Sequence, residues 1–403
     1  MAPSAGFTGV TKPAERAAHL TQTRNLKMAR SAHAYVRGSA VKFYEWLEAS
    51  GGKVPEGPPV WICGDCHMGN LGPLADARGR VAVQIRDLDQ TVIGNPAHDL
   101  IRLGLSLASA ARGSNLPGVT TAHIIEQLVA GYEAALMGEF DKEPARRPGP
   151  IGGLLDRSLR RRWKHMAAER LGAVEPGLPL GKRFWALTKA ERADLRELFD
   201  QPDVHAMITG LQHRDDVDPV EMVDAAYWLK GCSSLGRLRY AVMLRVGRGQ
   251  ASSLCLVDVK EAAAAAAPRS PKVVMPRDNA QRVVAGARAL SPHLGGRMLA
   301  TRLGERAVVL RELMPQDLKI EVERLTQNEA TALAFYLAGV VGRAHGRQMD
   351  RATRDRWLTE LGKARGARLD APSWLWLSVV ELLAVHEAAY LDHCRRFVLS
   401  QAA

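Results

Sequence analysis

Four polar residues in the first quarter of the chain have the types and spacing needed to hold a divalent metal ion and to activate a hydroxyl group: Asp65, Asn70, Asp87 and Asp89. Asp65 and Asn70 lie on an expected loop after an apolar run. There the carboxylate can orient or deprotonate a hydroxyl, and the amide oxygen can bind Mg²⁺. Asp87 and Asp89 follow the apolar stretch VAVQI and offer carboxylates to the same ion. Because Mg²⁺ prefers oxygen ligands and keeps several waters, one or two carboxylates plus substrate phosphates complete its coordination.

A second group of residues, later in the chain, has the composition of a phosphate-binding loop. The segment GCSSLG precedes the alternating stretch RLRYAVMLRVG, and the next apolar run, SSLCLVDVKEA, carries a lysine near its end. Glycines let backbone amides approach a phosphate, and a lysine on a strand supplies a point charge, which is how kinases hold ATP. We therefore expect a nucleotide to be bound by Gly231, Ser233, Ser234, Gly236 and Lys260.

The pattern GDxHxxN, followed by an apolar strand, an aspartate and GNPAHDLIRL, resembles the catalytic segment of aminoglycoside phosphotransferases and choline kinases. The resemblance implies that Asp65 is the catalytic aspartate, Asn70 the metal-binding asparagine and Asp87 the second metal-binding aspartate, because Gly94 and Asp99 then fall at the expected offsets. A register slip of two residues would give the last of these roles to Asp89 instead.

The chain more closely resembles the bacterial domain-of-unknown-function family 2252, whose pattern extends over most of its length. That pattern has RG near the start, then GDxHxxNFG, NDFDE and DxxR, and later GxxSxG and KEA. This sequence has RDLDQ at 86–90 where the family has NDFDE, so the first Asn and the last Glu are absent. It also has Cys63 where the phosphotransferases have His, and His67 inside the loop.

The order of these segments predicts an α+β, two-lobed, protein-kinase-like fold that is circularly permuted. The glycine-rich hairpin, the lysine strand, a hinge-like strand RAVVLREL and an apolar helix come late, whereas the catalytic loop comes early. Chain termini usually lie on the surface and often near one another, so such a permutation is physically cheap. Residues 1–140 and 326–403 are expected to form the helical lobe, 226–325 the sheet lobe and 141–225 a helical insertion.

Several flanking residues are expected to have structural roles. Residues 21–50 form a helical region that Gly38 interrupts, and Asp99 caps backbone amides and braces the Asp65 loop. Arg37 could contact a phosphate, but a surface salt bridge is the favoured interpretation. The basic stretch LLDRSLRRRWKHM is expected to be a solvated helix face, so nucleic-acid binding is not favoured. His345 is expected to be a core or capping histidine.

Composition limits the class of protein. The 403-residue chain carries a formal net charge of +12, which favours an anionic partner, although a compositional bias toward Arg and Ala explains the charge equally well. The first twenty residues lack the apolar core of a signal peptide, and no run reaches the roughly 18 apolar residues of a membrane helix. Five cysteines in so long a chain do not make a disulfide framework. We expect a cytoplasmic protein without a membrane span.

Alternative interpretations of the same residues are open. The pattern CxxCH at 63–67 matches a haem attachment signature, and a zinc site there lacks a second ligand pair. Asp65-x-His67 with the later carboxylates, Asn95 and His98 superficially resembles a two-metal phosphoesterase. A kinase-like protein that binds nucleotide without catalysis is a third possibility. The sequence best supports an ATP- and Mg²⁺-dependent phosphotransferase acting on an unidentified hydroxyl acceptor, either a small molecule or a protein.

Overall fold

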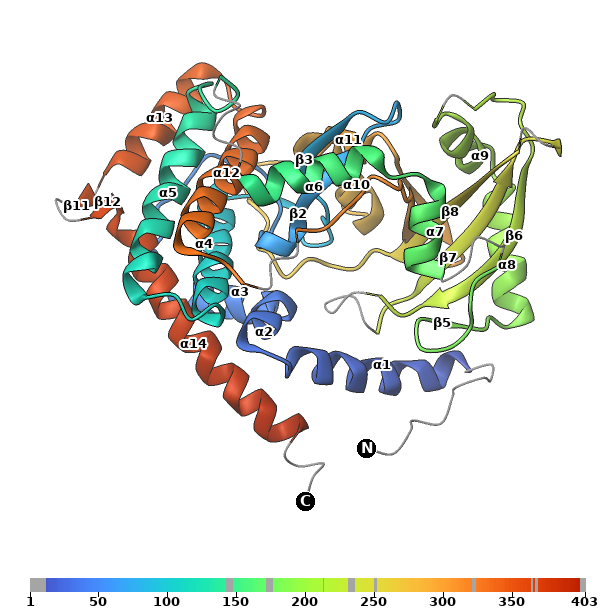
Figure 1. Cartoon of the computed structure of the whole chain (residues 1–403), viewed down its shortest axis with the longest axis horizontal. Coiled ribbons are helices and arrows are strands. Elements are labelled where there is room, and N and C mark those ends of the chain that lie inside the picture. The colour runs from blue at the N-terminus through green and yellow to red at the C-terminus, as the bar shows by residue number, and fades with distance from the viewer. Residues whose placement is uncertain are drawn as a thin grey trace.

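The structure of the protein is a computed structural model that describes residues 12–142, 148–171, 177–212, 214–230, 236–249, 252–320, 324–363, 365–366 and 369–398. The chain folds as a mixed α+β molecule, as the sequence predicts. Figure 1 shows most helices from the two ends of the chain on the left and an antiparallel sheet on the right, with short strands and helices between them and the first helix (Pro13–Met28) running below toward the sheet.

The largest sheet has six antiparallel strands. In spatial order they are β5 (Phe184–Trp185), β6 (Val220–Trp228), β7 (Arg239–Val246), β8 (Ser253–Glu261), β10 (Arg306–Glu312) and β9 (Met298–Leu303). Alternate residues of β7 face opposite sides, as a period of two requires. Tyr240, Val242 and Leu244 join one hydrophobic cluster, and Ala241 and Met243 join another. The predicted alternation of this strand is therefore confirmed.

Helices cover both faces of this sheet. α8 (Lys189–Phe199) and α9 (Pro202–Thr209) pack on one face, and α7 (Trp163–Leu171) packs on the other. The capping box that Thr188 forms with Glu191 starts α8. The sheet begins before the predicted boundary at 226, because β6 starts at Val220 and β5 comes from within the predicted insertion.

The helical part combines the beginning and the end of the chain. Its helices are α1 (Pro13–Met28), α2 (Ala32–Gly38), α3 (Ala40–Ala49), α4 (Pro96–Gly113), α5 (Gly118–Leu136), α12 (Gln327–Gly346), α13 (Arg351–Gly362) and α14 (Ser373–Phe397). A short hairpin joins the last two of these: β11 (Arg365–Gly366) and β12 (Leu369–Pro372). The predicted helical region 21–50 is broken at Ala29 and again at Ser39, so it forms parts of three helices.

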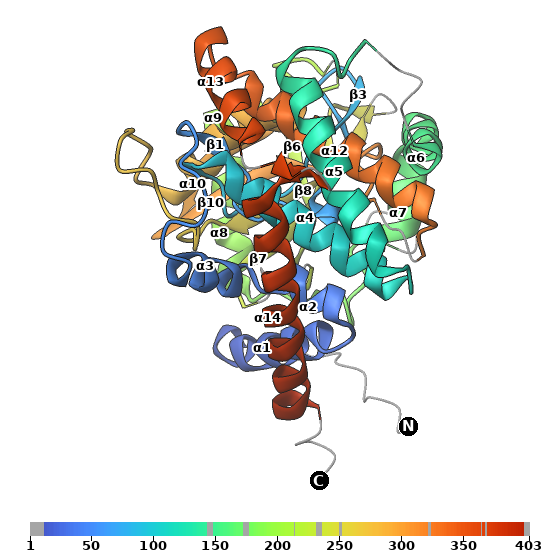
Figure 2. The ribbon, with the colours of Figure 1, turned by 90° about the vertical axis from the view of Figure 1, so that its left-hand side faces the viewer.

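α5 and α12 pack closely although they are far apart in sequence. A Cβ atom added to Gly131 on α5 would lie 2.0 Å from the carbonyl oxygen of Phe335 on α12, so only glycine permits this approach. α1 and α14 also contact each other, since Tyr390 Oη donates to the Ala29 carbonyl at 3.2 Å. Figure 2 shows α14 descending beside α1 and α2. The two ends of the chain therefore complete one helical unit.

α14 is also the one helix in the described residues that is long and apolar enough to cross a membrane by length and composition alone. Leu375, Val379, Leu382 and Leu383 of this helix are buried in the same hydrophobic cluster as α4 and α5. Leu377, Val380 and Leu391 of the same helix are exposed, so α14 packs on the core along one face only.

Short elements between the helical part and the sheet position the polar residues singled out above. They are β1 (Val60–Ile62), η1 (Met68–Asn70), β2 (Leu71–Ala75), β3 (Val81–Ile85), β4 (Val92–Gly94), α6 (Gly149–Arg160), α10 (Asn279–Leu290) and α11 (Pro292–Gly295). β1 pairs with β4 and β2 pairs with β3, both antiparallel. The segment after β1 carries Asp65, η1 carries Asn70, and the segment after β3 carries Asp87 and Asp89.

Candidate functional site

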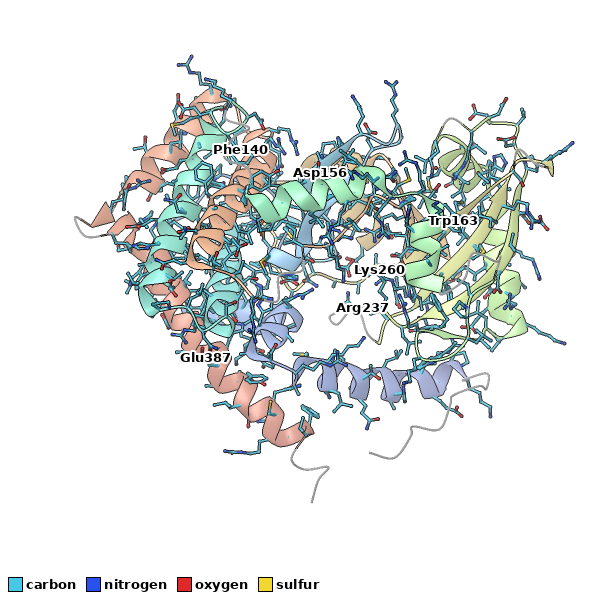
Figure 3. All side chains as sticks on the ribbon, viewed as in Figure 1. Phe140, Asp156, Trp163, Arg237, Lys260 and Glu387 are labelled. Carbon is cyan, nitrogen blue, oxygen red and sulfur yellow. The ribbon has the colours of Figure 1, made fainter. Side chains whose placement is uncertain are left out.

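A cavity of about 1170 Å³ lies between the sheet and the helical part. Figure 3 shows Lys260, which lines it, in this central position. Basic residues dominate the lining: Lys27, Arg30, Arg37, Arg86, Arg157, Arg160, Arg161, Arg183, Lys230, Arg239, Lys260, Arg311 and Lys319. The aspartates of the lining are Asp87, Asp89, Asp258 and Asp317. The cavity therefore suits anionic ligands, with a small acidic patch for a cation.

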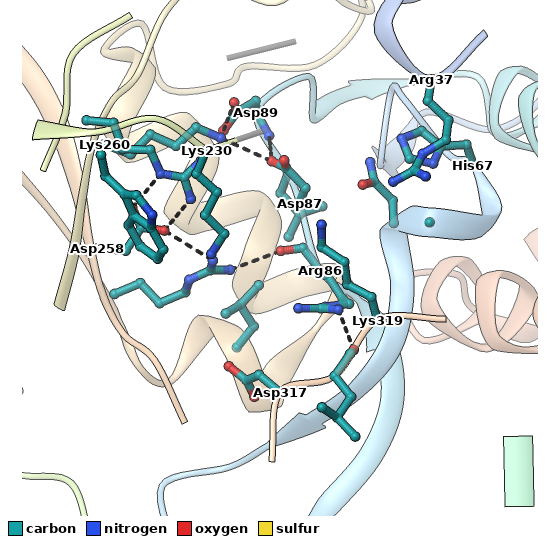
Figure 4. A pocket seen from close by; sticks show the side chains of 18 of the residues that line it. Arg37, His67, Arg86, Asp87, Asp89, Lys230, Asp258, Lys260, Asp317 and Lys319 are labelled. Carbon is teal, nitrogen blue, oxygen red and sulfur yellow. Dashed lines mark hydrogen bonds and ion pairs between the residues drawn. The ribbon is translucent and has the colours of Figure 1, made fainter. Parts of the chain in front are cut away.

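The expected nucleotide-binding lysine and the expected metal-binding aspartates meet in this cavity. Lys260, near the end of β8, forms an ion pair with Asp89, and its Nζ lies 3.4 Å from Asp87 Oδ1. Figure 4 shows these three side chains converging from the sheet and from the loop after β3. The other acidic residues on these strands have other partners: Asp258 pairs with Arg239, Glu312 with Arg214 and Glu261 with Arg306.

The electrostatic environment shifts the pKa values of Asp87 and Asp89 in opposite directions. Burial raises the pKa of Asp87, but Lys260, Arg239 and Arg311 outweigh it and hold that pKa below its ordinary value. Burial and the neighbouring Asp87 carboxylate raise the pKa of Asp89. The side chain of Asp87 is 42% exposed and that of Asp89 is 18% exposed. Asp87 is therefore the better placed of the two to hold a divalent cation from the cavity.

Asp258 links the sheet to the loop that carries these carboxylates. It is buried on β8 and accepts hydrogen bonds from Arg239 Nε at 2.8 Å and Arg311 Nη2 at 3.3 Å. Arg311 also donates to the Arg86 carbonyl at 3.1 Å, immediately before Asp87. Buried charges need partners with good hydrogen-bond geometry, and this cluster provides them. It fixes the position of Asp87 relative to the strand that bears Lys260.

Asp65 lies behind the cavity wall rather than on it. Its residue is 6% exposed, and Oδ1 accepts a hydrogen bond from Arg102 Nε at 2.9 Å. Oδ2 lies 3.9 Å from Nε2 of His67, which does line the cavity. Burial raises the pKa of Asp65, while Arg102 opposes that rise. Asn70 lines the cavity and donates through Nδ2 to the Asp65 carbonyl at 2.9 Å.

The predicted bracing role of Asp99 is confirmed. Its carboxylate accepts hydrogen bonds from the backbone amides of Cys63 at 2.7 Å and Gly64 at 3.0 Å, and it lies 3.2 Å from His345 Nε2. Asp99 lies in the first turn of α4, which begins at Pro96. Gly64 has φ of +75°, and a Cβ there would lie 2.1 Å from a backbone carbonyl, so glycine is required at this turn. His345 is fully buried, as expected of a core histidine.

The cysteines of the CxxCH pattern are packed in the core. Cys63 and Cys66 are fully buried in the main hydrophobic cluster, where a covalently attached haem has no access. Their sulfur atoms and the Asp99 carboxylate lie within 4.8 Å of one another. Both oxygens of that carboxylate already accept backbone amides, which leaves this group poorly suited to a metal ion.

The glycine-rich loop is described only at its ends. Gly231, Ser233 and Ser234 lie outside the described residues. Lys230, before the loop, lines the cavity, and Gly236 has φ of +101°, a left-handed conformation that favours glycine. The segment therefore enters and leaves beside the strand pair that carries Lys260.

Three arginines of the cavity were not identified as site residues from the sequence. Arg37 makes no ion pair among the described residues, so the favoured surface salt bridge is wrong; the residue lines the cavity instead. Arg157 and Arg160 on α6 also line it, so the basic stretch is not only a solvated face. Ser158 Oγ donates to the Gln316 carbonyl at 2.5 Å, which attaches α6 to the segment after β10. The RG of the family pattern was the sequence signal for Arg37.

Arg102, the partner of Asp65, was also missed, although the DxxR of the family pattern ends on it. The model of the family described as "Uncharacterized protein conserved in bacteria (DUF2252)" matches residues 16–396. No curated protein and no solved structure matches the chain.

Proposed function

Because the chain belongs to the bacterial family DUF2252, whose description names no activity, we propose its function from the cavity itself: an ATP- and Mg²⁺-dependent phosphotransferase of permuted protein-kinase-like fold. The acceptor is a hydroxyl compound. The use of ATP would place the protein in the cytoplasm.

The meeting of Lys260 with Asp87 and Asp89 carries this proposal. Kinases place a strand lysine on the nucleotide phosphates and an aspartate and an asparagine on Mg²⁺. Here the lysine strand and the aspartate loop come from distant parts of the chain and converge in one cavity, where Asn70 also lines the wall. Oxygen ligands of this kind suit Mg²⁺, so the residues fit the ion.

The element order supports the permutation. The hairpin of β6 and β7, the lysine strand β8, helix α10, strands β9 and β10 and helix α12 follow one another along the chain. The Asp65 loop comes first in sequence. It nevertheless lies against α12 through the contact of Asp99 with His345. This contact near the end of α12 supports the proposed permutation.

The chain's own residues divide the work of the transfer. The acceptor hydroxyl oxygen forms a bond to the γ-phosphorus, the bond from that phosphorus to the ADP oxygen breaks, and the hydroxyl proton leaves toward Asp65. His67, which lines the cavity, has its Nε2 3.9 Å from that carboxylate. Lys260 would bind phosphate oxygens, and Asn70 and Asp87 would hold the metal. Mg²⁺ supplies charge neutralisation, and positioning accounts for most of the rate in such reactions.

The two-metal phosphoesterase receives less support. Its third motif would require Asn95 and His98 at the metal site. Asn95 instead caps α4, accepting from the Ala97 amide at 3.0 Å, and donates to the Pro55 carbonyl at 2.7 Å. Neither residue lines the cavity.

A thermal-shift titration tests the proposed function. ATP with Mg²⁺ should raise the melting temperature, since a ligand that binds the native state stabilises it by RT ln(1 + [L]/Kd). The shift should vanish in Lys260→Ala and persist in Lys53→Ala, which removes an exposed lysine. A shift with Mn²⁺ alone, indifferent to ATP, would favour the phosphoesterase. ATP binding without transfer to any acceptor would favour a non-catalytic nucleotide-binding protein.

A further inference from the structure

The guanidinium group of Arg37 is held in place at the edge of the Asn70 loop. Arg37 lies on α2, lines the cavity and is partly buried. A Cβ atom added to Gly69 would lie 2.7 Å from Arg37 Nη2 and 2.8 Å from its Cζ. The guanidinium therefore rests directly on the backbone of Gly69, and the glycine makes room for it. A side chain positioned in this way differs from a solvated surface arginine.

No carboxylate compensates the charge of Arg37. Among the described residues its guanidinium makes no ion pair or hydrogen bond, and its charge acts on His33 and His67. Asp87 also acts on His67, and the Asp65 carboxylate lies 3.9 Å from His67 Nε2. Nδ1 of His67, a residue 5% exposed, is buried without a partner, and so is Nη1 of Arg102. Burial, and then the charge of Arg37, lower the pKa of His33 to about 4 and that of His67 well below its ordinary value. The guanidinium of Arg37 and the buried polar nitrogens beside it therefore leave hydrogen-bonding capacity that an anion can satisfy.

Further arginines extend this positive surface. Arg30 at the end of α1 and Arg157 and Arg160 on α6 line the same cavity. Within the part of the chain that the structure describes, their guanidinium groups have no hydrogen bond or ion pair. Arginine is the side chain best suited to bind phosphate, because its planar fork donates two parallel hydrogen bonds.

The cavity has room for a second ligand beside a nucleotide. Pockets for one small ligand typically occupy about 300–1000 Å³, and this one occupies about 1170 Å³. Figure 4 shows Arg37 and His67 on one side and Lys260 on the other, with Asp87 between them. A nucleotide whose phosphates reach Lys260 and Asp87 would leave the Arg37 side for the acceptor.

We propose that Arg37 and His67 form the centre of a phosphate subsite for the acceptor, so that the substrate is an alcohol that already carries a phosphate group. This inference rests on the proposed function and narrows its substrate class. The existing phosphate stays bound at Arg37, while a free hydroxyl of the same molecule takes the γ-phosphoryl group and releases its proton and ADP as described above.

Isothermal titration calorimetry with glycerol 3-phosphate tests the subsite. Glycerol is the uncharged control ligand, and glycerate is the control ligand that carries a carboxylate in place of the phosphate. The titrations are run alone and with saturating Mg²⁺ and a non-hydrolysable ATP analogue, which blocks the phosphate site at Lys260. Glycerol 3-phosphate should bind in both cases, glycerate more weakly and glycerol not measurably. Arg37→Gln should weaken glycerol 3-phosphate binding by about 10- to 100-fold, the value of a lost charged hydrogen-bond pair.

Two further variants separate charge from fold. Arg37→Lys keeps the charge but loses the fork, so binding should fall less than in Arg37→Gln, while both variants keep the analogue affinity of the wild type. Arg351→Gln removes an exposed arginine on α13 and should change nothing. The subsite would be overturned if glycerol 3-phosphate bound no more tightly than glycerol. It would also be overturned if the Arg37 variants lost as much affinity for the ATP analogue as for glycerol 3-phosphate. Failure of the analogue itself to bind wild-type protein would instead count against the proposed function.

Discussion

The ammonium group of Lys260 lies between two carboxylates of one loop, paired with Asp89 and 3.4 Å from Asp87 Oδ1. A divalent cation and this ammonium would neutralise the same oxygens, so they compete for them. A nucleotide would relieve the competition, because its phosphates attract Lys260 while the metal takes the carboxylates. Metal and nucleotide should therefore bind cooperatively at this site.

Removal of Lys260 should separate the two affinities. Lys260→Ala should bind Mn²⁺ alone more tightly than the wild type, because the competing charge is gone. The same variant should bind ATP about tenfold or more weakly, since a charged hydrogen bond to phosphate is lost. Titration calorimetry with each ligand measures both changes. Loss of both affinities together would show that the lysine supports the loop rather than competing for it.

Asp87 and Asp89 should contribute unequally to metal-dependent activity. Asp87→Asn should lower kcat by about 100-fold or more, because the exposed carboxylate with the lowered pKa is replaced by a neutral amide. Asp89→Asn should lower it less, since that carboxylate is more buried and its pKa is raised. Rates at a series of Mg²⁺ concentrations would distinguish the two. The reverse ranking would make Asp89 the main ligand.

Asp65 should matter for transfer and not for nucleotide binding. Asp65→Asn keeps the shape of the side chain and one acceptor for Arg102, but it removes the base. We expect kcat to fall about 10²- to 10⁴-fold with unchanged ATP affinity. Stopped-flow transfer and equilibrium binding on the same preparation measure both quantities. An unchanged rate in Asp65→Asn would mean that another group accepts the hydroxyl proton. His67, which lines the cavity, would then be the candidate.

Asp258 should stabilise the fold in a pH-dependent manner. Burial disfavours its ionised form, but Arg239 and Arg311 prevail and hold its pKa below the ordinary value. Its contribution is therefore complete above the unfolded pKa of about 3.9 and is lost as the pH falls through the folded value. Asp258→Asn should cost about 3–5 kcal/mol at pH 7 and flatten the acid limb of the stability profile.

The matched control for Asp258 is an exposed ion pair on the same sheet. Glu221 pairs with Arg245 at 2.8 Å on the surface. Glu221→Gln should change the free energy of unfolding by less than about 1 kcal/mol. Urea unfolding of both variants from pH 3 to pH 7 provides the comparison, and equal losses would contradict a special role for the buried cluster.

The contact of α5 with α12 should tolerate no side chain at Gly131. Gly131→Ala would place a methyl group 2.0 Å from the Phe335 carbonyl oxygen, so the helices must separate. We expect a loss of about 3 kcal/mol or more, as for severe overpacking. Gly152→Ala on α6 meets nothing within 4 Å and should stabilise the protein by about 0.5–1 kcal/mol. Thermal denaturation of the pair checks both signs.

The sequence predicted the elements whose signals are local. The alternation along β7 and the motifs that contain Asp65, Asn70 and Asp87 are each recognisable within a short stretch of sequence. The bracing role of Asp99 was predicted from its place near a helix start. The interruption predicted at Gly38 is where α2 ends. The break at Ala29 was missed, because apolar spacing continues across it even though Ser31 begins a new helix by accepting from the Ala34 amide.

Long-range partnerships could not be predicted in the same way. The pairing of Asp65 with Arg102, and the seat of Arg37 on Gly69, depend on how α2 and α4 pack around one loop. No spacing within either helix encodes that packing. Arg37 and Arg102 do belong to short motifs of the family pattern, RG and DxxR. A motif indicates that a residue is important, but it does not identify the residue that it contacts.

The packing of the chain's last helices on its first loops has a consequence for synthesis. Asp99 lies 3.2 Å from His345 Nε2, and the Trp61 amide donates to Gln348 at 2.8 Å. Residues synthesised early therefore depend on contacts with residues that are synthesised late. The strands β6 to β10 are contiguous and can associate while the ribosome is still adding α12. The Asp65 loop gains its support only when translation is nearly finished. Nascent or prematurely terminated chains would therefore carry all the residues proposed to act in transfer and still lack the support that α12 gives the Asp65 loop.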